Sequence, residues 1–235
     1  MMNFNADADR EKRKLRVLMT GFRPFNNEKI NPSFEAVKRV APSEKIELIR
    51  MELPVSYEKA PEILRESVRK YRPDAVICVG QAGGRSQITP EKCAINWMEA
   101  AIPDEDGVKA DGRKISMNGP DGLFSTLPVH QIAADLRKAG IPSAVSFTAG
   151  TYVCNALMYS LLNFLNHEPA SAKVRAGFIH VPYLTEQVIG KSGNLPSLEL
   201  SQIVRGLECA INSLSCEDHR GNHADPLMDD SEGTV

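Results

Sequence analysis

The run Ala75-Val76-Ile77-Cys78-Val79 is continuously apolar, as strands are when a parallel sheet buries both of their faces. The segment before it, residues 57–71, predicts an amphipathic helix, because its apolar residues recur at helical spacing: Ala60, Ile63, Leu64 and Val68. Pro61 fits the first turns of such a helix. A helix that leads into a buried strand is the repeating unit of an α/β sheet.

The same alternation continues along the chain. We predict further strands at 15–20, 46–53, 143–148 and 176–181, and further helices at 33–40, 129–139, 154–165 and 198–214. Residues 97–128 are rich in Pro, Gly and Asp and show no sustained period, so we expect a surface arm or lid there. The order of elements predicts an α/β fold: a single three-layer α/β/α sandwich with a mostly parallel, twisted sheet.

The composition is that of an ordinary globular protein. The chain has 235 residues, of which 42% are hydrophobic and 25% charged, and its formal net charge is −2. This balance gives no electrostatic case for binding nucleic acid or an anionic membrane. We predict a disordered charged leader at 1–14, a folded domain at 15–216 and a mobile charged tail at 217–235. The leader lacks the apolar segment of a signal peptide, and no apolar run approaches the ~20 residues that span a bilayer.

The cysteines form an odd set without a CxxC pair, which suits neither a zinc ribbon nor a disulfide framework. They are Cys78, Cys93, Cys154, Cys209 and Cys216. No histidine belongs to an HExxH pattern, so the sequence predicts no metal site. Unpaired thiols favour a reducing, cytoplasmic location.

Cys154 has the clearest chemical potential of these cysteines. It follows the turn at Gly150 and opens the helix predicted at 154–165. Amides in the first turn of a helix have no intrahelical acceptor and favour an anion, so a thiol there is expected to ionise more easily. The resulting thiolate is a nucleophile. The alternative is a small structural residue, because free cysteine is among the most buried residue types.

Two further residues fall beyond predicted strands, where α/β sheets gather their sites. His180 lies at the end of the strand at 176–181 and can take a proton from Cys154, and Glu91 can orient the imidazole. Amides beside Cys154 and in the Gly83-Gly84 turn are candidates for binding an oxyanion. The alternatives are a structural strand-end histidine, a carboxylate placed in a helix's first turn, and a phosphate-binding role for the glycines, which lack the spacing of known phosphate loops.

Six blocks of sequence, in one order and at compatible spacing between about Arg16 and Leu214, resemble pyroglutamyl peptidase I, a family of bacterial cysteine peptidases. The blocks are Thr20-Gly21-Phe22-Arg23-Pro24-Phe25, Asn31-Pro32-Ser33, Val79-Gly80-Gln81-Ala82-Gly83-Gly84-Arg85, Ile88-Thr89-Pro90-Glu91, Ala149-Gly150-Thr151-Tyr152-Val153-Cys154-Asn155 and Gly177-Phe178-Ile179-His180-Val181-Pro182-Tyr183.

The resemblance implies hydrolysis of the amide bond after an N-terminal pyroglutamyl residue of a peptide, through a thioester and without a cofactor. It implies Cys154 as nucleophile, His180 as general base and then acid, and Glu91 as the orienting carboxylate. The family's members are often oligomers, so we expect a dimer or tetramer. The residues implied for substrate binding are Phe22, Phe25, Asn31, Gln81, Ile102 and Val153. Apolar walls with a few hydrogen-bonding groups suit a lactam ring that carries no free ammonium.

Three positions depart from the family's pattern. Ala101 replaces the arginine of Ala-Arg-Ile-Pro-Asp, Asn26-Asn27 replaces Gly-Gly, and Ala156 stands where relatives often carry histidine. Asparagine tolerates positive φ, so the turn at 26–27 is expected to survive. Ala101 motivates a second hypothesis, a homologue that binds pyroglutamyl peptides without efficient cleavage. A third is a nucleoside phosphorylase-like enzyme with a glycine-rich loop, for which the sequence offers no basic constellation.

Overall fold

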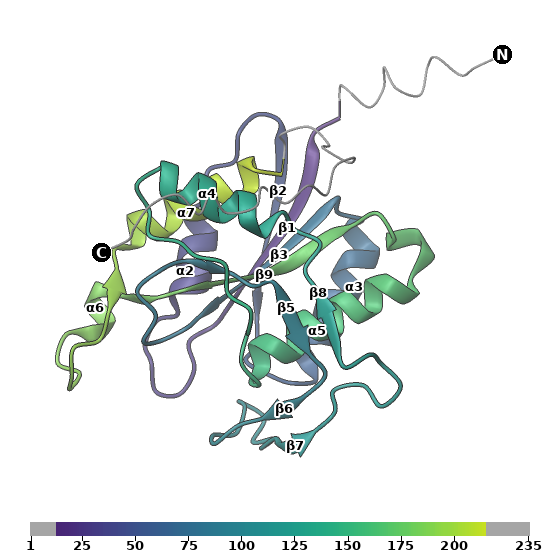
Figure 1. Ribbon diagram of the computed structural model, residues 1–235, viewed down its shortest axis with the longest axis horizontal. Coiled ribbons are helices and arrows are strands. Elements are labelled where there is room, and N and C mark those ends of the chain that lie inside the picture. Colours follow the sequence, from purple (N-terminus) through teal and green to yellow (C-terminus); the bar gives the residue numbers. More distant parts are fainter. Residues whose placement is uncertain (1–12, 215–235) are drawn as a thin grey trace, which may run out of the picture.

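The computed structural model describes residues 13–214, and a five-stranded sheet in the order β2-β1-β3-β9-β4 lies at its centre (Figure 1). Four of its strands are mutually parallel: β1 (Leu15–Phe22), β2 (Ile46–Leu53), β3 (Ala75–Gln81) and β9 (Arg175–Val181). The short edge strand β4 (Thr89–Pro90) runs antiparallel to β9. Every residue from Ala75 to Val79 is fully buried, as the unbroken apolar run predicts.

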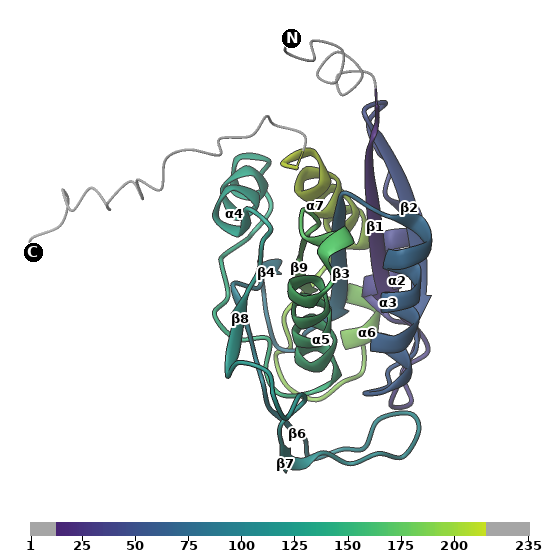
Figure 2. The same ribbon diagram turned by 90° about the vertical axis from the view of Figure 1, so that its right-hand side faces the viewer.

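Helices cover both faces of this sheet. The helices α2 (Pro32–Arg39), α4 (Val129–Lys138) and α7 (Leu200–Asn212) lie on one face, and α3 (Lys59–Tyr71) and α5 (Val153–His167) lie on the other (Figure 1). Figure 2 shows α7 between α2 and α4, both of which it contacts. The predicted fold class, an α/β sandwich with a mostly parallel sheet, is confirmed.

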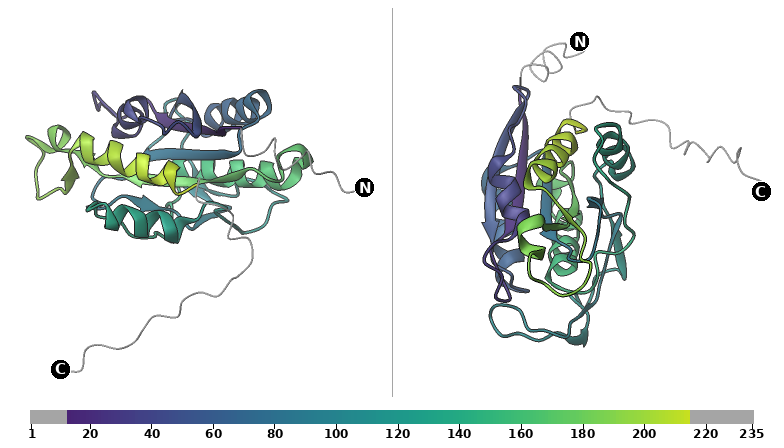
Figure 3. Two further views of the ribbon diagram at one scale, coloured as in Figure 1. Left: turned by 90° about the horizontal axis from the view of Figure 1, so that it is seen from above. Right: turned by 90° about the vertical axis from the view of Figure 1, so that its left-hand side faces the viewer.

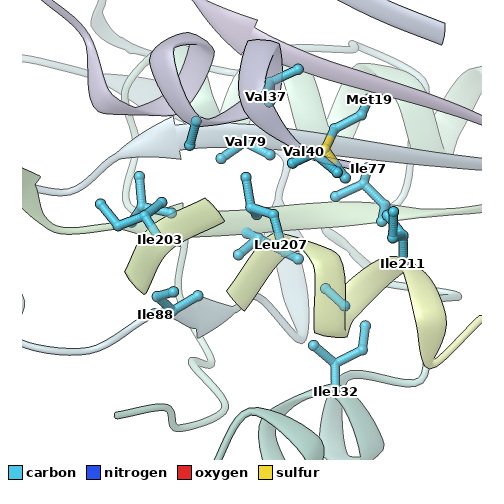
Figure 4. Packing of buried hydrophobic residues seen from close by; sticks show 14 of the residues in the cluster. Met19, Val37, Val40, Ile77, Val79, Ile88, Ile132, Ile203, Leu207 and Ile211 are labelled. Carbon is cyan, nitrogen blue, oxygen red and sulfur yellow. The ribbon is translucent and has the colours of Figure 1, made fainter. Parts of the chain in front are cut away.

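Each face of the sheet has its own hydrophobic core. Figure 4 shows the first of these cores, in which α7 packs against the sheet between α2 and α4. Its labelled side chains are Met19, Val37, Val40, Ile77, Val79, Ile88, Ile132, Ile203, Leu207 and Ile211. The second core joins β3 and β9 to α3 and α5 through residues such as Val76, Phe178, Leu64 and Leu157. Close packing in these two cores fixes the edge of the sheet that carries the candidate site.

The predicted arm at 97–128 contains two small ladders rather than a structureless loop. The strand β5 (Cys93–Ile95) pairs with β8 (Gly122–Phe124), and β6 (Met98–Glu99) pairs with β7 (Asp111–Arg113). The β6–β7 part projects below the body of the protein in Figures 1 and 2. A second extension, β10 (Tyr183–Leu184), α6 (Thr185–Val188) and β11 (Ser197–Leu198), projects from one end in Figure 3. A 3-10 turn (Pro169–Ser171) follows α5.

The strand predicted at 143–148 is wrong. The structure has only two isolated bridges there, Ile88 with Ser143 and Glu91 with Ser146. The segment runs along the short edge strand β4 instead of entering the sheet, and Phe147 is 65% exposed. Apolar side chains alone could not distinguish this edge position from a buried strand.

Other local predictions differ less from the structure. The strands β1 and β3 each extend two residues beyond the predicted ends, and α7 is shorter than the helix predicted at 198–214. Asn26 and Asn27 have φ of 54° and 61°, so asparagine does take over the turn where the family pattern has glycines. The predicted tail at 217–235 lies outside the described residues, as does the predicted leader except for Arg13 and Lys14.

Candidate active site

His180 and Glu91 are in direct contact at the carboxyl edge of the sheet. His180 is the penultimate residue of β9 and is 4% exposed, and its Nδ1 lies 2.7 Å from Oε1 of Glu91. Glu91 directly follows β4, and its backbone N–H donates to the carbonyl of Phe178 at 2.9 Å. The antiparallel pairing of β4 with β9 therefore delivers the carboxylate to the imidazole.

Cys154 is the second residue of α5, within the first turn that the sequence predicts for it. The chain enters the helix through Gly150, whose φ of +76° few other residues adopt readily, and through an extended Tyr152. The Cys154 sulfur lies only 3.0 Å from the position that a Cβ on Gly80 would occupy. Gly80 stands opposite His180 in the β3–β9 register, so the thiol lies over the strand pair that carries the imidazole.

The first intrahelical hydrogen bond of α5 is donated by the Ala156 amide to the Tyr152 carbonyl at 3.1 Å. The amides of Val153, Cys154 and Asn155 precede it and have no acceptor within the helix. These amides surround the thiol with donors suited to an oxyanion. They are among the groups that the sequence suggests for this task.

Removal from water shifts the pKa values of Cys154 and His180. Although the Cys154 side chain is only partly buried, its surroundings raise the pKa of the thiol to about 12, first by desolvation and then by the negative charge of Glu91. The expectation that the helix start makes this thiol ionise more easily is therefore wrong for the free protein, because desolvation outweighs the helix amides. Burial also lowers the pKa of His180, although Glu91 opposes this effect. The resting pair is a neutral thiol and a neutral imidazole.

Arg85 is the residue at this site whose role the sequence did not reveal. Its Nη1 donates to the Glu91 Oε1 atom at 2.6 Å, so that one carboxylate oxygen receives both the guanidinium and the imidazole. The sequence places Arg85 beside a glycine pair considered for phosphate, and no local signal connects it to a carboxylate six residues later. The other oxygen of Glu91, Oε2, is buried and has no hydrogen-bond partner among residues 13–214.

Aromatic rings pack in contact with one another near the candidate site. The rings of Phe22 and Phe178 lie 6.4 Å apart, and Phe178 is 4.7 Å from the His180 ring. The ring of Phe25 lies 6.1 Å from that of Tyr152, which immediately precedes α5. Phe22 is buried and Phe25 half-buried. Phe22 is thus linked to His180 through the Phe178 ring, and Phe25 contacts the residue that immediately precedes α5.

The two amide side chains implied for substrate binding already have partners in the free protein. Asn31 caps α2 by accepting from Ser33, and its amide donates to the Arg23 carbonyl. Gln81, at the end of β3, accepts a hydrogen bond from the Gln187 amide at 2.9 Å. Asn31 thus fixes the loop after β1, and its contact with substrate stays a prediction.

The last two residues implied for substrate binding, Ile102 and Val153, differ in the exposed fraction of their side chains. Ile102 is 42% exposed in the bend after β6, whereas Val153 is 1% exposed and packs in the core between the sheet and α5. Ala101, at the position of the family's arginine, is exposed beside Ile102. Their contact with substrate also stays a prediction.

Asn155, next to Cys154, is a second residue whose role the sequence did not indicate. Its fully buried side chain accepts from the Ile95 amide and donates to the carbonyls of Ile95 and Trp97, each at 2.9 Å. Thr151 adds a hydrogen bond to the Glu99 carbonyl at 2.7 Å. The arm is therefore fastened to the start of the helix that carries the thiol.

The described part of the chain contains neither a metal-binding cluster nor a membrane-spanning helix. Within residues 13–214, no three His, Cys, Asp or Glu side chains are grouped so that they could hold a metal ion. In the same range, no helix has both the length and the apolar character needed to cross a membrane.

Comparison with known proteins assigns the family. The sequence profile described as pyroglutamyl peptidase matches residues 15–217. The chain belongs to the pyroglutamyl peptidase family. Its similarity to curated pyrrolidone-carboxylate peptidases is 47% identity to those of Bacillus amyloliquefaciens, over 83% of this chain and 90% of the relative, and of Bacillus subtilis, over the same shares. The family assignment makes the protein a hydrolase and excludes the nucleoside phosphorylase-like hypothesis.

Solved structures of pyroglutamyl peptidases share the fold. The crystal structure of pyroglutamyl peptidase I from Bacillus amyloliquefaciens is similar with a TM-score of 0.82 and 44% identity, covering 87% of this chain and 96% of that one. The pyrrolidone carboxyl peptidase of Thermococcus litoralis is similar with a TM-score of 0.79 and 36% identity, covering 84% and 92%.

Proposed function

We propose that this member of the pyroglutamyl peptidase family hydrolyses the amide bond after an N-terminal pyroglutamyl residue, with Cys154 as nucleophile. The proposal is carried by one observation: Glu91 contacts His180 directly, at the sheet edge where the Cys154 sulfur lies against Gly80. A nucleophile, a base and a group that orients the base are the three parts that this chemistry needs.

The charge states of the free protein indicate how the first step proceeds. His180 is neutral at neutral pH because its pKa is lowered, so it is ready to accept a proton. The Cys154 thiol keeps its proton because its pKa is raised to about 12. We infer that the thiol transfers its proton to His180 as the sulfur attacks the scissile carbonyl, rather than resting as a thiolate. Glu91 then stabilises the imidazolium that forms.

The later steps return the side chains to their starting states. The tetrahedral oxyanion is stabilised by the amides at the start of α5. Its collapse breaks the carbon–nitrogen bond, the imidazolium gives its proton to the leaving amine, and a pyroglutamyl thioester remains on Cys154. Water, deprotonated by His180, attacks the thioester; the carbon–sulfur bond breaks, pyroglutamate leaves and the sulfur recovers a proton.

The side chains near the candidate site suit a pyroglutamyl group. The leaving amine must lie toward β9, because His180 protonates it, so the acyl ring lies toward β1 and the loop after it. That side carries the rings of Phe22, Phe25 and Tyr152. Apolar walls suit a five-membered lactam with no ammonium group, and the few polar groups nearby can bind its amide. A prolyl ring would leave such groups unpaired.

We further propose a cytoplasmic protein that works as a homo-oligomer and needs only these side chains and water. The unpaired thiols Cys78, Cys93, Cys154 and Cys209 suit a reducing compartment. The alternative of binding without efficient cleavage rests on Ala101 alone, whereas the contact between Glu91 and His180 favours catalysis.

The test is release of a chromophore from a pyroglutamyl amide by the wild type and by Cys154→Ser. Serine keeps the approximate size of the side chain but is a far weaker nucleophile than cysteine. We therefore expect a loss of about a thousandfold or more in kcat. The control is Cys93→Ser, a half-buried thiol outside the proposed machinery, which should retain activity. Turnover by Cys154→Ser at the wild-type rate would refute the nucleophile assignment.

A further inference from the structure

We propose that Arg85 is a positioning residue of this reaction, which holds Glu91 in place as the hydrogen-bond partner of His180 and ties it to the loop that precedes Cys154. This inference rests on the proposed function and deepens it. It adds a cation to the three residues considered so far, and it assigns to that cation a role that acts entirely through its neighbours.

The guanidinium of Arg85 joins three segments of the chain. Its Nη1 donates to the Thr89 hydroxyl at 2.5 Å and to the Glu91 Oε1 atom at 2.6 Å, and its Nη2 donates to the Thr148 carbonyl at 3.0 Å. Arg85 itself follows β3, Thr89 and Glu91 belong to the edge strand and its end, and Thr148 stands two residues before the Gly150 turn into α5. A planar group with several fixed donors is suited to such a junction, and a lysine ammonium is not.

The burial of Glu91 explains why a cation is needed at this junction. Its side chain is fully buried, and its Oε2 has no partner among residues 13–214. A buried carboxylate without compensation favours its protonated form. The contact with neutral His180 alone offers one hydrogen bond, whereas the guanidinium brings a permanent positive charge to the same oxygen. Without Arg85, the Oε1 atom of Glu91 would keep its hydrogen bond with His180 but would lose its contact with a permanent cation.

The positive charge of Arg85 also affects the pKa values of the two reacting groups, Cys154 and His180. The guanidinium opposes the raised pKa of the Cys154 thiol, in which burial is the largest cause and the charges of Glu91 and the Cys78 thiol act in the same direction as burial. It adds to the effect of burial in lowering the pKa of His180, while Glu91 acts in the opposite direction. One cation therefore acts on both reacting groups: it lowers the pKa of the Cys154 thiol and that of the His180 imidazole.

Because Arg85 is partly exposed to solvent, its role can be tested by chemical rescue. Its side chain is 29% exposed, whereas that of Glu91 is fully buried, so Arg85 links the buried carboxylate to the protein surface. Removal of the side chain in Arg85→Ala would open a path by which a small guanidinium ion in solution could reach Glu91. A matched control is Arg69→Ala, which removes a guanidinium paired with Glu168 at 3.1 Å, on α3.

The test compares the wild type, Arg85→Ala, Arg85→Lys and Arg69→Ala in cleavage of a pyroglutamyl chromogenic amide, with thermal unfolding measured in parallel. We expect Arg85→Ala to stay folded, to lose about a hundredfold in kcat and to change KM by less than about threefold, since Arg85 acts on the base and not on the substrate. Arg85→Lys should recover part of the loss, because it restores charge without the bridging geometry. Millimolar guanidinium chloride should raise kcat of Arg85→Ala with saturation, and should not raise that of the wild type or of Arg69→Ala.

Wild-type kcat in Arg85→Ala would overturn the inference. A folded Arg85→Ala whose loss neither Arg85→Lys nor guanidinium relieves would also overturn it. The proposed function has a separate readout, because a wild type that does not cleave the amide refutes that function before any variant is compared.

Discussion

Cys154 begins a helix, where free amides favour a thiolate, yet its thiol pKa is raised to about 12 in the free protein. The sequence shows the helix start but not the burial, which comes from packing of the site against Gly80 and the strands behind it. Likewise, nothing near Glu91 in the sequence shows that Arg85 and His180 share one of its oxygen atoms. The three candidate residues could therefore be named from the sequence, but the contacts of Glu91 and the pKa shifts of Cys154 and His180 could not.

A pH profile tests these charge states at the level of single residues. Because the pKa of His180 is lowered from 6.5, the imidazole stays neutral on acidification to that value, and kcat/KM for a pyroglutamyl amide should fall only below it. Glu91 raises the pKa of His180, so in Glu91→Gln the acidic limb of the residual activity should move to still lower pH. An acidic limb above pH 6.5 in the wild type would contradict the assignment.

At the scale of elements, local patterns predicted most strands and helices because each pattern lies within one contiguous segment. The helix before β3 and the buried strand itself are clear examples. The segment at 143–148 was wrongly predicted as a strand, because its place beside the edge strand β4 depends on residues far away in the sequence. The arm was expected on the surface, but its attachment to α5 through Asn155 depends on contacts about 60 residues apart, as the separations of 58 and 60 show.

Replacement of Asn155 tests how the arm depends on α5. Asn155→Ala would remove the side-chain amide that hydrogen-bonds to three backbone groups, the N–H of Ile95 and the carbonyls of Ile95 and Trp97. We expect the free energy of unfolding to fall by about 2–4 kcal/mol, because unpaired buried polar groups are costly. Urea denaturation gives this value. Asn163→Ala on the same helix is the control, since its Oδ1 is buried without a partner in residues 13–214, and an equal loss in both variants would contradict the argument.

At the scale of the whole molecule, parallel strands bring distant residues to one edge of the sheet. His180 and Glu91 are 89 positions apart in the chain, and the pairing of β4 with β9 and of β3 with β9 places them beside Gly80 and the thiol. The α/β pattern was sufficient to predict that candidate residues gather beyond strand ends. It could not show which of them touch, because that depends on strand order and register.

The same burial makes global stability depend on alkaline pH. The thiols of Cys78 and Cys154 have pKa values raised from 9.0 to about 12, so between these values they keep their protons in the folded protein but lose them in the unfolded chain. The unfolded state then binds fewer protons, and the free energy of unfolding falls as pH rises. We expect this fall to begin at about pH 9 and to continue toward about pH 12 in urea denaturation, with a shallower slope for Cys154→Ser. Identical slopes for the two proteins would contradict the raised pKa of Cys154.

Gly80 contributes to this site by lacking a side chain. A methyl group there would lie 3.0 Å from the Cys154 sulfur and closer still to the Phe178 ring, at 2.7 Å, so the sulfur could not remain where it is. The position of the proposed nucleophile therefore depends on the space beside Gly80 as much as on the proposed proton acceptor. Any redesign of this enzyme that preserves every reactive group but fills that volume would keep the full set of chemical parts and lose their alignment.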